Sequence, residues 1–166
     1  MHAIGDKVMY ATYGVMEIVD IRRESIGDVS REYYVMRESG SNSPTQVFVP
    51  IDNKKLVDSM RVLLTKEEAI HLIKSIPLLP VLEWKRDNRI RSESFRKIVE
   101  SGNREKMLSL IKTVYENGER RNADGKKNYL TDEAFMKKAE KLIFAELSEV
   151  FAIPVSEIPE FIKKNM

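Results

Sequence analysis

The chain has 166 residues, with 28 Lys and Arg, 26 Asp and Glu, two His, one Trp and no Cys. This length suits one compact domain or two small ones and excludes a large multidomain enzyme. The lack of cysteine excludes disulfide scaffolds, thiolate zinc sites and cysteine nucleophiles, and it favours a reducing compartment. The first residues lack the pattern of a signal peptide, and no apolar run approaches the roughly 18 residues of a membrane-spanning helix. We therefore expect a cytoplasmic protein without a membrane partner.

Residues 5–50 have the pattern of short strands. Four segments rich in β-branched and aromatic residues are separated by turn residues, and they cover 7–12, 15–21, 32–36 and 46–49. Four of the seven glycines fall within the first 40 residues, as expected where a tightly curled sheet needs turns and bends. We expect a small, bent β-barrel of the SH3 or Tudor type. Pro50 should end its last strand because proline cannot donate to a strand ladder.

From Thr65 onward, apolar residues recur at helical spacing. Thr65 and Glu68 match a capping box, and Pro77 ends the helix that follows. Further helices are expected over 94–100, from about Asn103, and from Thr131 to Pro154. The sequence therefore predicts a β-plus-α protein of two domains, with a small bent β-barrel over 1–60 and an all-α helical bundle over 61–166.

Charge is divided unevenly between these two parts. Residues 1–60 hold seven basic and nine acidic residues, whereas 61–166 hold 21 and 17. The basic excess is concentrated in 84–112, which has nine basic residues and four acidic ones. A mixed-charge helical surface explains such a stretch as well as an anion-binding surface does. The local excess makes nucleic acid a candidate partner.

Little in the sequence indicates catalysis. The glycine-rich phosphate loops are absent, His71 has no carboxylate pattern beside it, and His2 is terminal. The acidic pair Glu67-Glu68 lies in a first helical turn, where the helix dipole explains it. No spaced cluster predicts a metal site. We expect a binding protein, not an enzyme, with no cofactor and no small-molecule substrate.

The most informative segment surrounds the single tryptophan. Trp84 follows the prolines at 77 and 80 and precedes basic residues at 85, 86, 89 and 91. An isolated tryptophan is most often part of a core. Minor-groove binders, however, also flank an apolar side chain with cations, which neutralise phosphates while the side chain props open a base step. Such binding responds to salt and DNA shape, and the minor groove offers little base-specific information.

A series of short motifs runs along the chain. They are Gly5-Asp6-Lys7-Val8-Met9-Tyr10, Tyr13-Gly14-Val15, Val49-Pro50, Trp84-Lys85, Ser101-Gly102-Asn103, Gly125-Lys126-Lys127 and Thr131-Asp132-Glu133. This ordered series resembles the CarD/CdnL family of bacterial transcription regulators. The first motifs are also similar to the RNA-polymerase-interacting domain of the transcription-repair coupling factor, whose helicase motors could not fit in this length.

The resemblance implies a mechanism. In this family the N-terminal Tudor-like domain binds the β-subunit lobe of bacterial RNA polymerase by strand addition, which would associate the protein with the nucleoid. The helical domain places a tryptophan as a wedge in the minor groove at the upstream edge of the melted promoter. Trp84 matches that wedge, and contact with promoter DNA would be weak and largely non-sequence-specific. The residues expected to bind DNA are Trp84, Lys85, Arg86, Arg89, Arg91 and Lys97.

Strand addition requires an exposed sheet edge, which we place at the strand ending at Pro50. The residues expected to bind polymerase are Glu24, Thr45, Gln46, Val47, Phe48, Val49 and Pro50. Glu24 and Phe48 stand where some relatives carry arginines. An inner strand explains Val47–Val49 equally well. The competing interpretation of the whole chain is a protein-interaction adaptor, with Trp84 packed in a core and no direct role in DNA binding.

Overall fold

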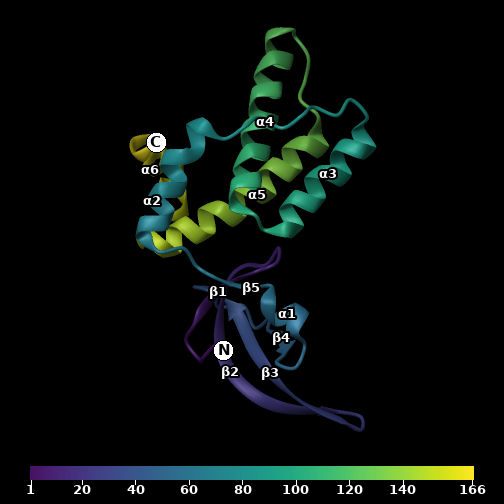
Figure 1. Cartoon of the computed structure of the whole chain (residues 1–166), viewed down its shortest axis with the longest axis vertical. Coiled ribbons are helices and arrows are strands. Elements are labelled where there is room, and N and C mark those ends of the chain that lie inside the picture. Colours follow the sequence, from purple (N-terminus) through teal and green to yellow (C-terminus); the bar gives the residue numbers. More distant parts are fainter. The chain divides into compact units, whose positions relative to one another are not determined.

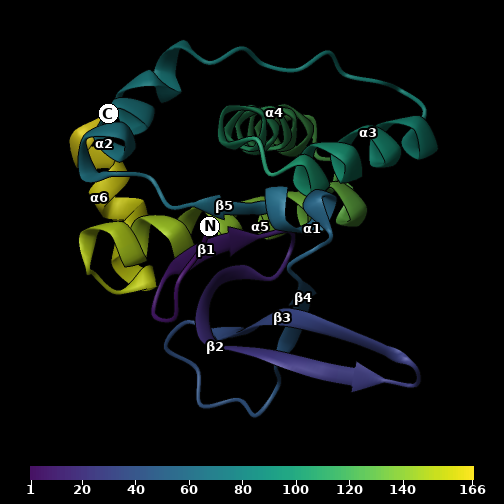
Figure 2. The ribbon, with the colours of Figure 1, turned by 60° about the horizontal axis from the view of Figure 1, so that its bottom comes forward.

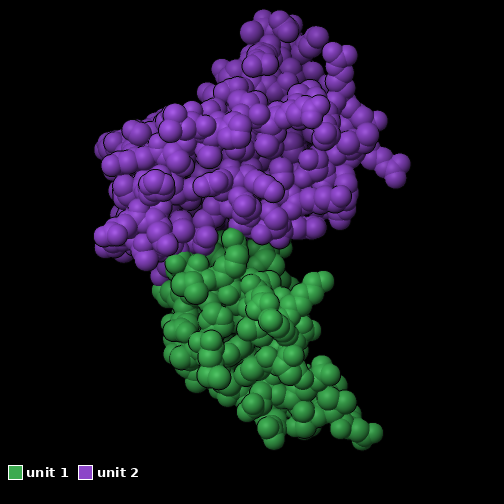
Figure 3. Space-filling model, in the orientation of Figure 1, with its two compact units in different colours: residues 1–63 green, residues 64–166 purple.

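The computed structural model describes all 166 residues and divides them into two compact units, Met1–Leu63 and Leu64–Met166 (Figure 3). The first unit is built on β-strands, and the second consists of helices (Figure 1). This arrangement confirms the predicted β-plus-α fold class.

The first unit is an antiparallel five-stranded sheet with the strand order β4-β3-β2-β1-β5. The strands are β1 (Lys7–Tyr10), β2 (Gly14–Ile26), β3 (Val29–Glu38), β4 (Val47–Pro50) and β5 (Met60–Val62), with the short helix α1 (Lys54–Asp58) before β5. β2 and β3 continue past their neighbours as a two-stranded hairpin that turns at Gly27 and Asp28 (Figure 2). A register shift between Ile18 and Asp20 adds a bend to β2.

One face of this sheet covers a hydrophobic core. Successive strand residues point to opposite faces, so alternate residues enter the core. They are Val8, Tyr10, Met16, Ile18, Tyr34, Met36, Val49 and Met60. α1 packs Leu56 and Val57 against the same cluster. α1 and β5 were not predicted, because segments this short carry too few residues to show a period.

The second unit contains five α-helices and two single 3₁₀ turns. The α-helices are α2 (Lys66–Ser75), α3 (Asn88–Ser101), α4 (Arg104–Ala123), α5 (Leu130–Phe151) and α6 (Ile158–Asn165), and the 3₁₀ turns are η1 (Ile76–Leu78) and η2 (Val155–Glu157). α5 contacts α2, α3, α4 and α6, so it is the central helix of the unit. Its buried Leu142, Ile143 and Leu147 supply much of the core.

Capping residues set where these helices begin. The Thr65 hydroxyl accepts from the Glu68 N–H at 3.1 Å, and the Glu68 carboxylate accepts from the Thr65 N–H at 2.8 Å, which confirms the predicted capping box. α3 begins earlier than the helix expected over 94–100, because the Asp87 carboxylate accepts from the N–H groups of Arg89 and Ile90. Asp87 thereby places the basic segment partly on a helix.

Candidate functional sites

The strand expected to bind a partner lies at an edge of the sheet. β4 is hydrogen-bonded within the sheet to β3 alone. The Ile51 N–H donates to the Glu32 carbonyl at 2.9 Å, which identifies these two residues as a hydrogen-bonded pair. Bonded and non-bonded pairs alternate along an antiparallel ladder, so the N–H and C=O of Phe48 point away from β3. The free edge therefore presents the Phe48 backbone to another strand.

The side chains of β4 alternate between the two faces of the sheet. Val49 is fully buried in the core, whereas Phe48 lies on the opposite face and is 41% exposed. The Phe48 ring meets Tyr33 edge-to-face with centroids 6.1 Å apart, and the Arg22 guanidinium carbon lies 5.2 Å from the Phe48 centroid. Arg22 Nε also pairs with Glu24 Oε1 at 2.9 Å. Arg22 thus joins two residues expected to bind polymerase, Glu24 and Phe48, on one surface.

The other residues expected at this edge flank or complete β4. Thr45 and Gln46 belong to the connection that leads into the strand, and Thr45 is exposed. Val47 begins the strand and packs at the margin of the core, and Pro50 ends it. Pro50 has no N–H, so the edge available to another strand is short.

Trp84 lies in the non-helical segment before α3 and is half-buried. Its ring meets Phe95 edge-to-face at 6.5 Å and lies 6.4 Å from Tyr129 with an interplanar angle of 30°. The guanidinium carbon of Arg91 lies 4.4 Å from the Trp84 centroid. Trp84 is therefore held by packed neighbours while part of its surface stays open to solvent, which is intermediate between the core residue and the exposed wedge considered above.

Arg91 was expected to contact phosphate, but the structure buries it to 2% exposure. Its Nη2 lies 2.9 Å from Asp132 Oδ2, and its Nε donates to Asp132 Oδ1 at 3.1 Å. Nη1 donates to the Lys85 carbonyl at 2.8 Å, and Nη2 donates to Asn88 Oδ1 at 2.7 Å. Burying a charge is costly unless the charge is paired and hydrogen-bonded, and Arg91 meets both conditions. It fixes the backbone beside Trp84, and we remove it from the expected phosphate contacts.

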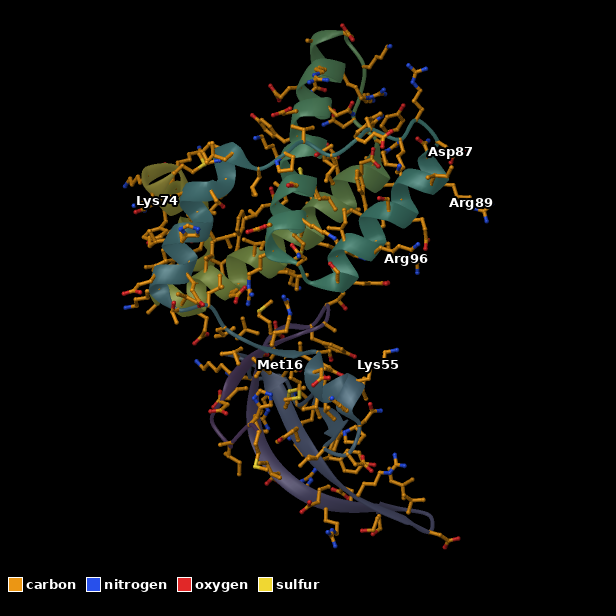
Figure 4. All side chains as sticks on the ribbon, viewed as in Figure 1. Met16, Lys55, Lys74, Asp87, Arg89 and Arg96 are labelled. Carbon is orange, nitrogen blue, oxygen red and sulfur yellow. The ribbon has the colours of Figure 1, made fainter.

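The other basic residues of this segment lie at the surface. Arg86 and Arg89 are exposed and form no ion pair, and Arg89 projects from the start of α3 (Figure 4). Lys97 is exposed two turns further along the same helix. Lys85 is half-buried, with its Nζ 3.7 Å from Glu83 Oε2. Lys85, Arg89 and Lys97 all line a shallow groove along α3. We refer to Trp84, Lys85, Arg86, Arg89 and Lys97 as the Trp84 surface.

Arg96 lies on the same helix but is neutralised locally. It pairs with Glu93 and lies 3.8 Å from Glu100. The hydrogen bond from Arg96 lowers the pKa of Glu93 and raises the pKa of Arg96 itself. Arg86 and Arg89, unlike Arg96, have no acidic partner. They are therefore the arginines near Trp84 whose charge is open to an external anion.

Sequence reasoning missed Arg22, Tyr129 and Asp132, which come to these sites from distant parts of the chain. Asp132 is 41 residues from Arg91, and no local pattern links them. One signal was present: once Asp87 is recognised as the cap of α3, Arg91, Phe95 and Val99 follow at intervals of four. All three are buried. This spacing places Arg91 on the inner face of the helix.

Other kinds of site find little support in the described residues. No group of three or more His, Asp or Glu side chains is placed to hold a metal ion. None of the helices combines the length and apolar character that crossing a membrane requires. His71 is exposed on α2.

The comparison with known families concerns the first unit. Residues 3–62 match the family model of the CarD-like/TRCF RID domain, the RNA-polymerase-interacting domain. None of the curated proteins matches the chain. The matched residues contain all five strands, including the β4 edge, and stop before the helical unit. The match confirms the resemblance for the motifs that lie within residues 3–62, and the motifs from Trp84 onward lie outside the matched range. Residues 3–62 are therefore similar to the CarD-like/TRCF RNA-polymerase-interacting domains.

Proposed function

We propose that this protein is a transcription regulator that binds the β subunit of bacterial RNA polymerase and promoter DNA together. The RID domain would dock on the polymerase through β4. Trp84 would enter the minor groove as a wedge at the edge of the melted promoter and stabilise the open complex. The observation that carries the DNA-binding part is the position of Trp84, which is half-buried, held by Arg91 and adjacent to the unpaired cations Arg86 and Arg89.

Docking by strand addition requires main-chain donors and acceptors on a free edge. The N–H and C=O of Phe48 supply one such pair, and the Phe48 ring with Arg22 and Glu24 adds a mixed apolar and charged surface beside it. The match of residues 3–62 to the RID domain family supports RNA polymerase as the partner. In this proposal the β-subunit lobe would offer the sheet edge that such a strand extends.

A wedge acts best when it is already ordered. Immobilising a flexible side chain on binding costs about 0.5–1.5 kcal/mol, and packing against Phe95, Tyr129 and Arg91 removes part of that cost for Trp84. Arg86 and Arg89 can each neutralise a phosphate and release counterions. So few contacts give weak binding to free DNA. Attachment to the polymerase would raise the effective concentration of the Trp84 surface at the promoter.

The test is the lifetime of the open promoter complex with the wild type and with Trp84→Ala. We expect Trp84→Ala to shorten the lifetime by about tenfold, since one aromatic–base stack is worth about 1–3 kcal/mol. Binding to polymerase should be unchanged. Tyr115→Ala is the matched control, because Tyr115 is a 61% exposed aromatic residue on α4 of the same unit. An unchanged lifetime with retained polymerase binding would refute the wedge.

The aromatic packing of Trp84 also favours a second candidate, a protein-interaction adaptor whose β unit docks a strand and whose helical unit holds another protein. In that case Trp84 serves the core alone. Trp84→Ala would then lower the free energy of unfolding without changing contact with promoter DNA in the polymerase complex. Site-specific crosslinking of the Trp84 surface to the upstream edge of the promoter distinguishes the two functions.

A further inference from the structure

Trp84 is connected to the start of α5 by a stack of alternating aromatic rings and guanidinium groups. The guanidinium carbon of Arg91 lies 4.4 Å from the Trp84 centroid and 4.8 Å from the Tyr129 centroid. The guanidinium carbon of Arg121, at the end of α4, lies 4.0 Å from the Tyr129 centroid. The groups are therefore in contact in the order Arg121, Tyr129, Arg91 and Trp84. The first two lie outside the basic segment around Trp84.

Arg121 also fixes the loop that leads to Tyr129. Its Nε donates to the Lys127 carbonyl at 2.8 Å, and its own carbonyl accepts from the Lys126 N–H at 2.8 Å. Tyr129 is the N-cap residue of α5 and has no side-chain capping bond. Its ring contacts Arg121, Arg91 and Trp84.

We infer that Tyr129 and Arg121 are positioning residues for Trp84, an inference that rests on the wedge function proposed above. A guanidinium over an aromatic face is attracted by the ring quadrupole, and more strongly where both groups are shielded from water. Arg91 is almost fully buried, so its contacts with Tyr129 and Trp84 are of the shielded kind. Tyr129 limits the orientations open to the indole, and Arg121 limits those open to Tyr129.

Arg121 could instead act through its charge alone, as a phosphate contact. The neighbouring Arg120 separates these two roles. Arg120 carries the same charge, is 79% exposed in its side chain and lies 4.0 Å from Glu116, but it makes no ring contact. A charge effect should appear on removing either arginine, whereas a positioning effect should appear on removing Arg121 alone.

The first experiment uses the free full-length protein and acrylamide quenching of its single tryptophan, which reports on Trp84 alone. We expect a larger quenching constant in Arg121→Met and Tyr129→Leu. Tyr129→Phe keeps the ring and should resemble the wild type, and Arg120→Met should not change quenching. Thermal unfolding of each variant shows that the fold is retained. Unchanged quenching in both Arg121→Met and Tyr129→Leu would overturn the inference.

The second experiment measures the open-complex lifetime with the same variants. We expect Arg121→Met and Tyr129→Leu to shorten it by about fivefold, the change expected from the loss of one cation–π contact. Polymerase binding and the lifetimes with Tyr129→Phe and Arg120→Met should stay at the wild-type level. If Trp84→Ala shortens the lifetime and these two variants do not, the positioning role is wrong. If Trp84→Ala has no effect while quenching still changes, the wedge function fails and the restraint of Trp84 stands.

Discussion

The two candidate sites of this protein are built from different parts of the polypeptide. The β4 edge offers backbone groups, which every residue except proline can supply. The Trp84 surface consists of side chains, and the segment that carries Trp84 and Lys85 is held by one buried ion pair, Arg91 with Asp132. Side-chain changes on β4 therefore leave the edge in place. The Trp84 surface should tolerate much less change at Arg91 and Asp132.

The largest expected effect comes from removing one member of the buried pair. Asp132→Ala leaves the Arg91 charge buried without its carboxylate, and we expect the free energy of unfolding to fall by about 3–5 kcal/mol. Urea unfolding followed by circular dichroism measures this change. The double variant Arg91→Met with Asp132→Ala should lose less than Asp132→Ala alone, because no unpaired charge remains buried.

Arg96→Met is the matched control on the same helix. Arg96 pairs with Glu93 and Glu100 at the surface, where solvent screens an ion pair and leaves it little net effect on stability. If Asp132→Ala were no more destabilising than Arg96→Met, the contrast between a backbone site and a side-chain site would fail.

The same contrast explains which features could be predicted from the sequence. Thr65 and Glu68 are three residues apart, so their capping box is a local pattern and was predicted. The strand that ends at Pro50 is also local. In the sequence Arg91 resembles Arg86 and Arg89, since all three belong to one basic run. Arg91 is buried, unlike Arg86 and Arg89, for two reasons. The start of α3 at Asn88 places Arg91 on the inner face of the helix, and tertiary packing brings Asp132 of α5 against it.

The second prediction concerns the backbone of β4. Phe48→Pro removes an N–H that points away from β3, so the ladder within the sheet keeps its hydrogen bonds. We expect affinity for RNA polymerase to fall by about threefold to tenfold, the value of one net hydrogen bond. Polymerase binding measured by biolayer interferometry tests this expectation.

Phe48→Ala serves as the comparison, because alanine removes the ring but keeps the N–H. Its loss of affinity should be smaller than that of Phe48→Pro if the edge acts through its backbone. Equal losses in the two variants would show that the Phe48 ring, with Arg22 beside it, carries the contact instead.

The smallest expected effect lies in the salt dependence of DNA contact. The logarithm of the binding constant falls with the logarithm of salt concentration in proportion to the number of phosphates neutralised. Arg86→Ala and Arg89→Ala should each reduce that slope by about one, whereas Arg96→Ala should change it less because Glu93 and Glu100 already balance its charge. Arg91→Met would weaken DNA binding by displacing Trp84. It would leave the slope of the salt dependence unchanged, because Arg91 contacts no phosphate. A drop of about one in the slope for Arg91→Met would instead mean that Arg91 leaves Asp132 to contact phosphate when DNA binds, and the division between buried support and exposed contact would have to be redrawn.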